Sequence, residues 1–150
     1  MAGVIFDPIH NELFAAEKGS GATLNDRRLR VTAREQLEEA MLVTGNPRHL
    51  IKTGKTAGPI FDDVSKSGAI LRYFGATALD LAYVAAGRCD GCWHYTIQPW
   101  DIAAGMLLVE EAGGIVSEID GAPAHAHSKN VMASNRMLHA PIRQLLAKTA

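Results

Sequence analysis

The stretch PWDIAAGMLLVEEAGG, residues 99–114, decides the expected fold. Its apolar residues recur at spacings of four and three, the period of one helix face: Ile102, Met106 and Val109. Between them Ala103, Ala104 and Gly105 present little bulk, so the helix can pack closely against a sheet. The pair Gly113-Gly114 ends it. The stretch therefore predicts a buried helix packed on a β-sheet.

Short strands and further helices are predicted on both sides of this helix. The expected strands are Met41–Thr44, Ala69–Leu71, Gly91–Tyr95, Ile115–Ser117 and Val131–Ala133. The expected helices are Ile60–Lys66, within a segment of mixed signals from Arg48 to Ser67, then Ala76–Ala86, and Arg136–Lys148 with Pro141 in its first turn or at a kink. Strands and helices that alternate in this way favour an α/β layered domain.

The first forty residues are expected to be mostly strand. Alternating apolar and polar residues predict a hairpin, with Val4–Phe6 and Leu13–Ala15 joined by a turn at Asp7–Asn11. Two more strands, Ala22–Leu24 and Leu29–Val31, are expected around a tight turn at Asn25–Arg28, and a helical turn at Glu35–Ala40.

The length and composition predict one globular domain over residues 1–150. A chain of 150 residues with 47% hydrophobic content can bury a core. Fifteen Lys and Arg balance sixteen Asp and Glu without a long run of either sign, so neither nucleic acid nor an anionic membrane is an expected partner. The start, MAGVIFDPIHNELF, has no signal-peptide or membrane-span pattern, and a cytoplasmic location is expected.

Asp101 is the first candidate for chemistry, because it stands where the helix from Ile102 is expected to begin. The free N–H groups and the dipole of a helix amino terminus stabilise a carboxylate there. The side chain therefore either caps the helix or points outward to a cation. The position alone favours the cap.

Cysteines and histidines offer weaker signals. The spacing Cys89-Asp90-Gly91-Cys92 suits a redox dithiol or half of a zinc site, but a second pair with suitable spacing is missing, so two buried reduced cysteines are expected. His125 and His127 flank Ala126 in a polar loop, and a loop surface is favoured over a metal site.

Longer segments of the sequence resemble sequences of the inositol monophosphatase family. GATALDLAYVAAGR, residues 75–88, is followed by PWDIAAG and EEAGG, and together these resemble the second signature region of the family. The opening GVIFDPIHNELFAAEKGSGATLN resembles the hairpin that follows the first metal-binding motif of the family, and VMASNRMLH its last strand and turn. The resemblance covers nearly the whole chain and implies the carboxyl-terminal part of that fold, a mixed sheet flanked by helices.

The resemblance implies a Mg²⁺-dependent phosphomonoesterase, in which carboxylate-bound metal ions activate a water for attack on phosphorus. Asp101 matches the metal-ligating aspartate, and Gly75, Ala76 and Thr77 match the segment that lies along the substrate. His94 stands where the family often has a glutamate that binds a substrate hydroxyl, and Ala76 where Ser or Thr is common. The implied substrate is inositol phosphate or a related small ester, with nucleotide bisphosphate, fructose bisphosphate and histidinol phosphate as alternatives. The implied assembly is a homodimer.

The remaining metal ligands of the family are missing from this chain. They come from an upstream glutamate pair and an Asp-Pro-Ile/Leu-Asp-Gly-Thr motif. Asp7-Pro8-Ile9-His10 imitates part of that motif but is expected to be a turn, and Glu110-Glu111 is expected to be a solvated face. The sequence thus predicts a truncated chain with part of an active site. The alternative is a catalytically inactive fragment that acts as a structural or self-associating module.

Overall fold

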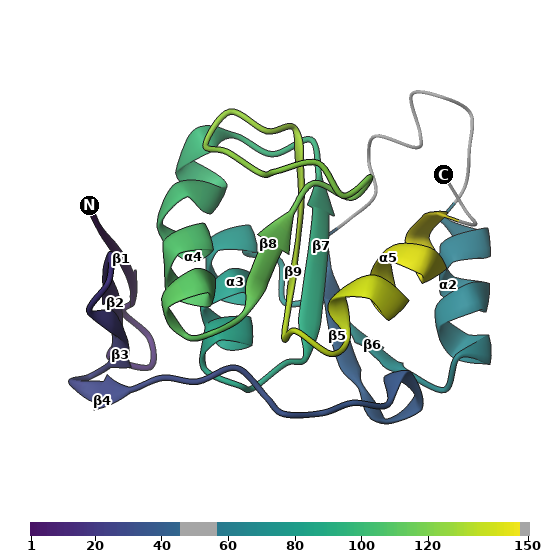
Figure 1. Ribbon diagram of the computed structural model, residues 1–150, viewed down its shortest axis with the longest axis horizontal. Helices are drawn as coiled ribbons and strands as arrows, with labels where there is room; N and C mark the ends of the chain where they lie inside the picture. The colour runs from purple at the N-terminus through teal and green to yellow at the C-terminus, as the bar shows by residue number, and fades with distance from the viewer. Residues whose placement is uncertain (46–56, 148–150) are drawn as a thin grey trace.

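The computed structural model describes residues 1–45 and 57–147 as two sheets and the helices that pack on them (Figure 1). The strands are β1 (Ala2–Asp7), β2 (Glu12–Glu17), β3 (Gly21–Leu24), β4 (Arg27–Arg28), β5 (Met41–Thr44), β6 (Ile70–Arg72), β7 (Gly91–Tyr95), β8 (Ile115–Ser117) and β9 (Asn130–Ser134). The helices are η1 (Leu37–Glu39, a 3-10 turn), α2 (Gly58–Lys66), α3 (Thr77–Ala85), α4 (Pro99–Glu111) and α5 (His139–Ala147).

These elements form four layers. Figure 1 shows the sheet β1–β4 at one side, then α3 and α4, then the five-stranded sheet, then α5 and α2. One apolar core lies around α3 and α4 and reaches both sheets, and a second lies between the five-stranded sheet and the α2–α5 layer. The α/β layered fold with a mixed sheet flanked by helices is confirmed.

The five-stranded sheet has the order β6-β5-β7-β9-β8. Strand β5 pairs in parallel with β6 and β7, whereas β9 pairs antiparallel with β7 and β8. The parallel strands therefore place their carboxyl ends at one edge. That edge is where ligands bind in open α/β sheets.

The first sheet is antiparallel, with the order β1-β2-β3-β4. The β3–β4 turn is made by Asn25 and Asp26, both at positive φ, 45° and 65°, a conformation that these residue types tolerate. The expected turn at Asn25–Arg28 was therefore too long. The expected strand Leu29–Val31 is wrong. The Leu29 N–H still donates to Ala22 of β3, but the Val31 N–H donates to Ala112, directly after α4, so the chain leaves the first sheet after Leu29.

Small residues let α4 approach its neighbours closely, as its sequence predicts. A Cβ at Gly105 would lie 2.6 Å from Cβ of Leu81 on α3, and a Cβ at Gly3 would lie 3.0 Å from Cα of Ala104. Gly105 thus sets the contact between the two helices, and Gly3 the contact between α4 and β1. This packing holds α4 between α3 and the first sheet.

Element boundaries differ from expectation where the helices begin. Helix α4 begins at Pro99, not at Ile102, because Gln98 and not Asp101 is its N-cap. Helix α5 begins at His139, not Arg136, with Pro141 in its first turn as expected. The expected Arg48–Ser67 segment falls partly on residues 46–56, which lie outside the described residues. Strand β6 begins at Ile70, one residue later than expected, and none of the described helices is long and apolar enough to cross a membrane.

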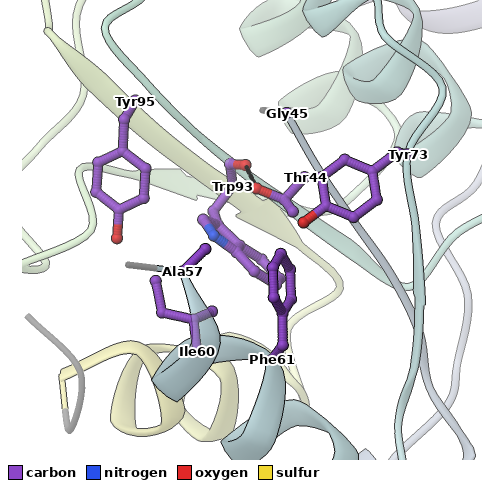
Figure 2. Close-up of a pocket in the computed structure, with 8 residues that line it drawn as sticks. All are labelled: Thr44, Gly45, Ala57, Ile60, Phe61, Tyr73, Trp93 and Tyr95. Atoms are coloured by element: carbon purple, nitrogen blue, oxygen red, sulfur yellow. Dashed lines mark hydrogen bonds between the residues drawn. The ribbon is translucent and has the colours of Figure 1, made fainter. Parts of the chain in front are cut away.

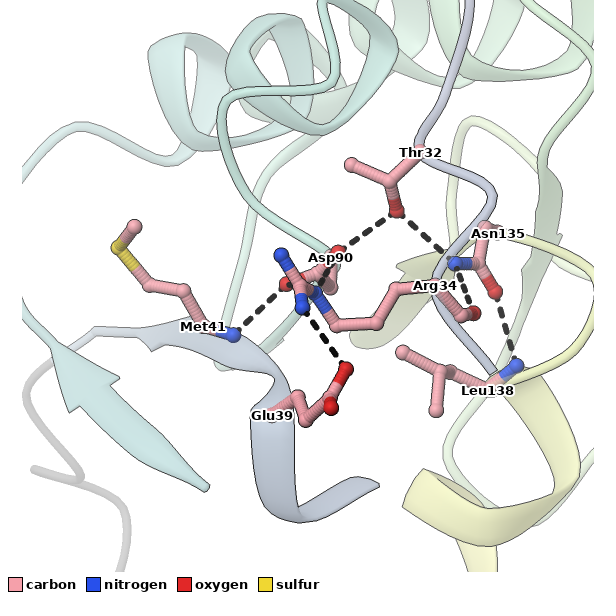
Figure 3. A network of polar contacts seen from close by, with 7 residues as sticks. All are labelled: Thr32, Arg34, Glu39, Met41, Asp90, Asn135 and Leu138. Carbon is pink, nitrogen blue, oxygen red and sulfur yellow. Dashed lines mark hydrogen bonds and ion pairs between the residues drawn. The ribbon is translucent and has the colours of Figure 1, made fainter. Parts of the chain in front are cut away.

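A polar network around Asp90 ties the connection between the two sheets to the rest of the fold (Figure 3). The buried Asp90 carboxylate accepts hydrogen bonds from the Thr32 hydroxyl (2.7 Å), the Met41 backbone N–H (2.7 Å) and Arg34 Nε (3.2 Å). The Asn135 side chain donates in turn to Thr32 Oγ1 and to the Arg34 carbonyl. The connection around Thr32 and Arg34, between β4 and β5, is therefore held by side-chain hydrogen bonds.

Candidate active site

One cavity brings together all the site residues that the sequence predicts. Gly75, Ala76, Thr77, His94 and Asp101 line a space of about 310 Å³ together with Gly45 and residues 95–97. The lining comes from the end of β5, the start of α3, the end of β7 and the first turn of α4. The cavity thus lies at the carboxyl ends of the parallel strands. Such a crevice is the usual ligand site of open α/β sheets.

Asp101 occupies the third position of helix α4, not the N-cap. One of its oxygens, Oδ2, accepts a hydrogen bond from the Gln98 backbone N–H at 2.8 Å. The Gln98 side chain accepts the backbone N–H of Asp101, which completes a reciprocal capping box. The Asp101 carboxylate therefore takes part in capping the helix, although Gln98 is the N-cap residue. It also borders the cavity and uses only one oxygen in the cap.

The segment Gly75–Thr77 lines the cavity with the amino terminus of α3. Gly75 has φ of +88°, a conformation that favours glycine, and a Cβ there would meet nothing within 4 Å. Ala76 is the N-cap, and it supplies no side-chain hydrogen bond to the helix. The first N–H groups of a helix carry partial positive charge and favour anions such as phosphate. This end of the cavity therefore suits a phosphate group.

His94 is buried on β7 and faces two polar side chains of α3. Its Nδ1 lies 3.4 Å from the Thr77 hydroxyl and its Nε2 lies 3.1 Å from Oδ2 of Asp80. Asp80 is completely buried. The sequence analysis did not single out Asp80, although a carboxylate inside the apolar run ALDLAYVA was a signal that could have found it.

A second, aromatic cavity adjoins the first (Figure 2). It is lined by Thr44, Gly45, Ala57, Ile60, Phe61, Tyr73, Trp93 and Tyr95. Its volume is about 10 Å³, which is room for about one water molecule. Gly45 and Tyr95 line both spaces. The aromatic cavity is too small for a sugar or inositol ring, so the larger cavity is the candidate site.

The side chains around the cavity do not make a Mg²⁺ site by themselves. Within residues 1–45 and 57–147, no group of three His, Cys, Asp or Glu side chains could hold a metal ion. Mg²⁺ demands near-octahedral oxygen ligands and is usually held by one or two carboxylates with waters and substrate phosphates. Asp101 offers one carboxylate oxygen, and further ligands must come from elsewhere.

The pair Cys89 and Cys92 is buried and free, as expected for packed thiols. Burial raises the pKa of Cys89 to about 11, with Asp80 and Asp90 adding to the effect, and burial raises the pKa of Cys92 well above 9.0. A thiolate is the reactive form of cysteine. Neither side chain is therefore poised for redox chemistry or metal binding.

We expect both thiols to react with a disulfide reagent at pH 8 at least about 100-fold more slowly in the folded chain than in urea. The reason is that a pKa of about 11 leaves little thiolate at that pH. The release of thionitrobenzoate over time measures the two rates. Fast release from the folded chain at the rate of the unfolded control would contradict the assignment.

The string Asp7-Pro8-Ile9-His10 forms the turn between β1 and β2, as predicted. Asp7 Oδ1 accepts the Ile9 backbone N–H, and Oδ2 lies 2.8 Å from His10 Nδ1. The hydrogen bond from His10 lowers the pKa of Asp7 below 3.8, and the same bond raises the pKa of His10 above 6.5. The Asp7 contribution to stability is lost as pH falls through its lowered pKa, and the His10 contribution as pH rises through its raised pKa. The pair is therefore complete between about pH 4 and 6.5.

Replacing Asp7 with asparagine is expected to lower the pKa of His10 toward 6.5, because the main cause of the shift is removed. Chemical shifts of the imidazole protons against pH give this value. Glu12→Gln is the matched control, since Glu12 acts on His10 only through a weaker charge effect and should lower the pKa less. Equal shifts in the two variants would contradict the pairing.

The histidine pair His125 and His127 and the acidic pair Glu110 and Glu111 lie outside the cavity. His125 and His127 are exposed on a loop, where the His127 N–H donates to His125 Nδ1. The expected solvated acidic face is wrong for Glu111, whose carboxylate accepts the N–H groups of Gly19 and Gly21 at 2.7 and 2.8 Å. Of the two glutamates, Glu110 is exposed and Glu111 is partly buried. These bonds lower the pKa of Glu111.

The fold and this cavity define a class: layered α/β proteins with a polar, carboxylate-bearing crevice at the ends of their parallel strands. The sequence pattern of the inositol monophosphatase family matches residues 1–149. The chain belongs to the inositol monophosphatase family.

Similar proteins bear this out. An inositol-1-monophosphatase of Caulobacter vibrioides is 44% identical over 97% of this chain and 58% of its own length. The Nus factor SuhB of Escherichia coli is 45% identical over 88% of this chain and 49% of its own. The solved inositol monophosphatase of Anabaena superimposes with a TM-score of 0.91 at 38% identity, over 98% of this chain and 58% of that one. This chain thus spans about half the length of the relatives it matches.

Proposed function

We propose that this chain carries part of the active site of a Mg²⁺-dependent phosphomonoesterase, whose substrate is inositol phosphate or a related small phosphate ester. The supporting observation is the single cavity shared by Gly75–Thr77, His94 and Asp101. These residues come from three separate stretches of sequence. The three stretches can act on one substrate only if they lie together, and they meet at the carboxyl ends of the parallel strands.

Each part of the cavity has a proposed role. The amino terminus of α3, with the Gly75–Thr77 segment, lies along the substrate and favours its phosphate. His94 contacts the organic part of the substrate from the floor of the cavity. Asp101 presents an oxygen to the metal while Oδ2 keeps its bond to Gln98. The cap thereby fixes the direction of the carboxylate.

Mg²⁺ is proposed to be shared between Asp101 and carboxylates of a preceding segment, as the resemblance implies. A bound metal ion in such a site supplies charge stabilisation at the phosphoryl oxygens and a nucleophilic water. Among residues 1–45 and 57–147, Asp101 is the single carboxylate that lines the cavity, so turnover by this chain alone is proposed to be negligible. A cytoplasmic location and a homodimeric assembly complete the proposal.

A chimera tests this function. We call it the reconstituted enzyme: this chain fused behind the amino-terminal part of the Caulobacter vibrioides relative. We expect it to release phosphate from inositol phosphate with Mg²⁺ and to lose that activity with a chelator, whereas the chain alone stays inactive. Nucleotide bisphosphate, fructose bisphosphate and histidinol phosphate are tested in parallel. If none of the substrates is cleaved although the chimera folds, the proposal is wrong.

The second candidate function is that of a catalytically silent module that associates with itself. The edge strand β1 supports this second function, since β1 pairs with β2 on one side and with none of the other described strands. Val4, Phe6 and Leu13 expose 59%, 53% and 43% of their surface on these two strands. Unpaired, apolar strand edges favour pairing with another chain. Sedimentation velocity of the 150-residue chain tests self-association, and a monomer at high concentration contradicts the module. A concentration-dependent dimer supports the module over the enzyme only when the reconstituted enzyme folds and stays inactive, because the enzyme is also proposed to be a homodimer.

A further inference from the structure

The Asp80 carboxylate is a buried acceptor that the proposed function leaves unexplained. The residue has no exposed surface, and neither of its oxygens has a hydrogen-bond partner among residues 1–45 and 57–147. A buried carboxylate without donors is costly, and such groups in native proteins call for an explanation. The explanation has to come from the groups that surround it.

The polar atom that lies against Asp80 is Nε2 of His94, 3.1 Å from Oδ2. This nitrogen also has no aligned hydrogen bond in the part of the chain that the structure describes. At this distance the two groups are within hydrogen-bond reach, and such bonds often tighten only when a ligand binds. The two unsatisfied groups are therefore partners for each other.

An acceptor at Nε2 decides which nitrogen of a neutral imidazole carries the proton. An ionised carboxylate can only accept a hydrogen bond, so as a carboxylate Asp80 favours the tautomer with hydrogen on Nε2. Nδ1 is then an acceptor, and in this structure its nearest donor is the Thr77 hydroxyl at 3.4 Å. In catalytic triads a buried aspartate fixes the tautomer of a histidine in the same manner.

Nδ1 of His94 is turned toward the cavity. It lies 3.4 Å from Oγ1 of Thr77, and a Cβ at Gly45 would come within 2.9 Å of it. Both residues line the cavity. The missing side chain at Gly45 leaves the approach to Nδ1 open, and the long contact to Thr77 leaves room for a better donor.

We propose that Asp80 is a positioning residue that holds His94 with its proton on Nε2, so that Nδ1 accepts a hydrogen bond from a substrate hydroxyl. The identity of the ligand as a substrate rests on the proposed function. The pair selects polyol and sugar monophosphates. It disfavours esters that bring a second phosphate or a carboxylate to this point, because such groups offer only lone pairs to Nδ1.

The tautomer can be measured on the 150-residue chain itself, without any turnover. Long-range ¹H–¹⁵N spectra of the imidazoles at pH 8.5 separate the two neutral tautomers. We expect His94 to show a protonated Nε2 and a bare Nδ1, and Asp80→Asn to replace this pattern with a mixture. Asp62→Asn, an exposed aspartate on α2, is the control and should leave it unchanged. A protonated Nδ1 in the unaltered chain, or an unchanged tautomer in folded Asp80→Asn, overturns the proposal.

The second arm uses the reconstituted enzyme and a set of monodeoxy inositol phosphates. Loss of the hydroxyl that meets Nδ1 should raise KM about 5- to 10-fold with little change in kcat, the effect of one hydrogen bond. His94→Glu keeps an acceptor and should keep this discrimination, whereas Asp80→Asn should lose it. Equal KM for every deoxy substrate contradicts the hydroxyl contact. If the reconstituted enzyme never releases phosphate, the proposed function is wrong. The ¹H–¹⁵N spectra then still test whether Asp80 fixes the tautomer of His94.

Discussion

Replacing Asp101 with asparagine is expected to lower kcat/KM of the reconstituted enzyme by at least about 100-fold. A metal ion contributes several kcal/mol to the stabilisation of the transition state for phosphoryl transfer. Each ~1.36 kcal/mol of that stabilisation changes the rate tenfold. Asparagine keeps an oxygen that can accept the Gln98 N–H, so the capping box and the helix survive. Phosphate release against substrate concentration measures the loss.

Glu110→Gln is the matched control, because Glu110 is an exposed carboxylate on the same helix. Its activity should stay within about 2-fold of the unaltered chimera, since surface substitutions of this kind have small effects. A reduced Mg²⁺ affinity in Asp101→Asn alone separates a lost ligand from a misfolded helix. An unchanged rate in Asp101→Asn would remove Asp101 from the site.

Replacing Asp90 with alanine is expected to lower the free energy of unfolding by about 3 kcal/mol. The buried carboxylate accepts bonds from Thr32, Arg34 and the Met41 backbone, and its removal leaves these donors unsatisfied (Figure 3). Domains are stable by only about 5–15 kcal/mol, so the loss is a large share of the total. Urea denaturation followed by circular dichroism gives the value.

The control for the network is Glu39→Ala. Glu39 lies 3.2 Å from Arg34 on the outside of the network, and the side chains of Arg34 and Glu39 are 39% and 60% exposed. Exposed ion pairs contribute about 0–1 kcal/mol, so this variant should stay close to the unaltered chain. Comparable losses in the two variants would mean that the buried donors around Asp90 are not the cause.

Sequence patterns predicted most of the fold because its elements have strong local signals. The spacing of Ile102, Met106 and Val109 identified α4, and the alternation around Asp7–Asn11 identified the first hairpin. The errors lie where long-range contacts decide. The N–H of Leu29 still bonds to Ala22 of β3, but that of Val31 bonds to Ala112 beside α4, so the expected strand Leu29–Val31 is a connection between the sheets.

The candidate site was predictable in its composition but not in its internal contacts. The family resemblance named Gly75–Thr77, His94 and Asp101, and the structure places them around one cavity. The resemblance did not show that the Asp80 side chain points into the interior, because a single carboxylate on a helix usually faces solvent. Nor could it show that Glu111 binds the Gly19–Gly21 turn, a contact between segments about ninety residues apart.

The central claim is that the cavity of this chain holds half of a metal-dependent phosphatase site. Its most direct test is a crystal structure of the reconstituted enzyme with Mn²⁺ in place of Mg²⁺ and inorganic phosphate. The anomalous signal of manganese is expected within about 2.0–2.3 Å of an Asp101 oxygen, the range for hard cations on carboxylates, with phosphate at the amino terminus of α3. Metal bound away from Asp101, with the cavity free of phosphate, would contradict the account.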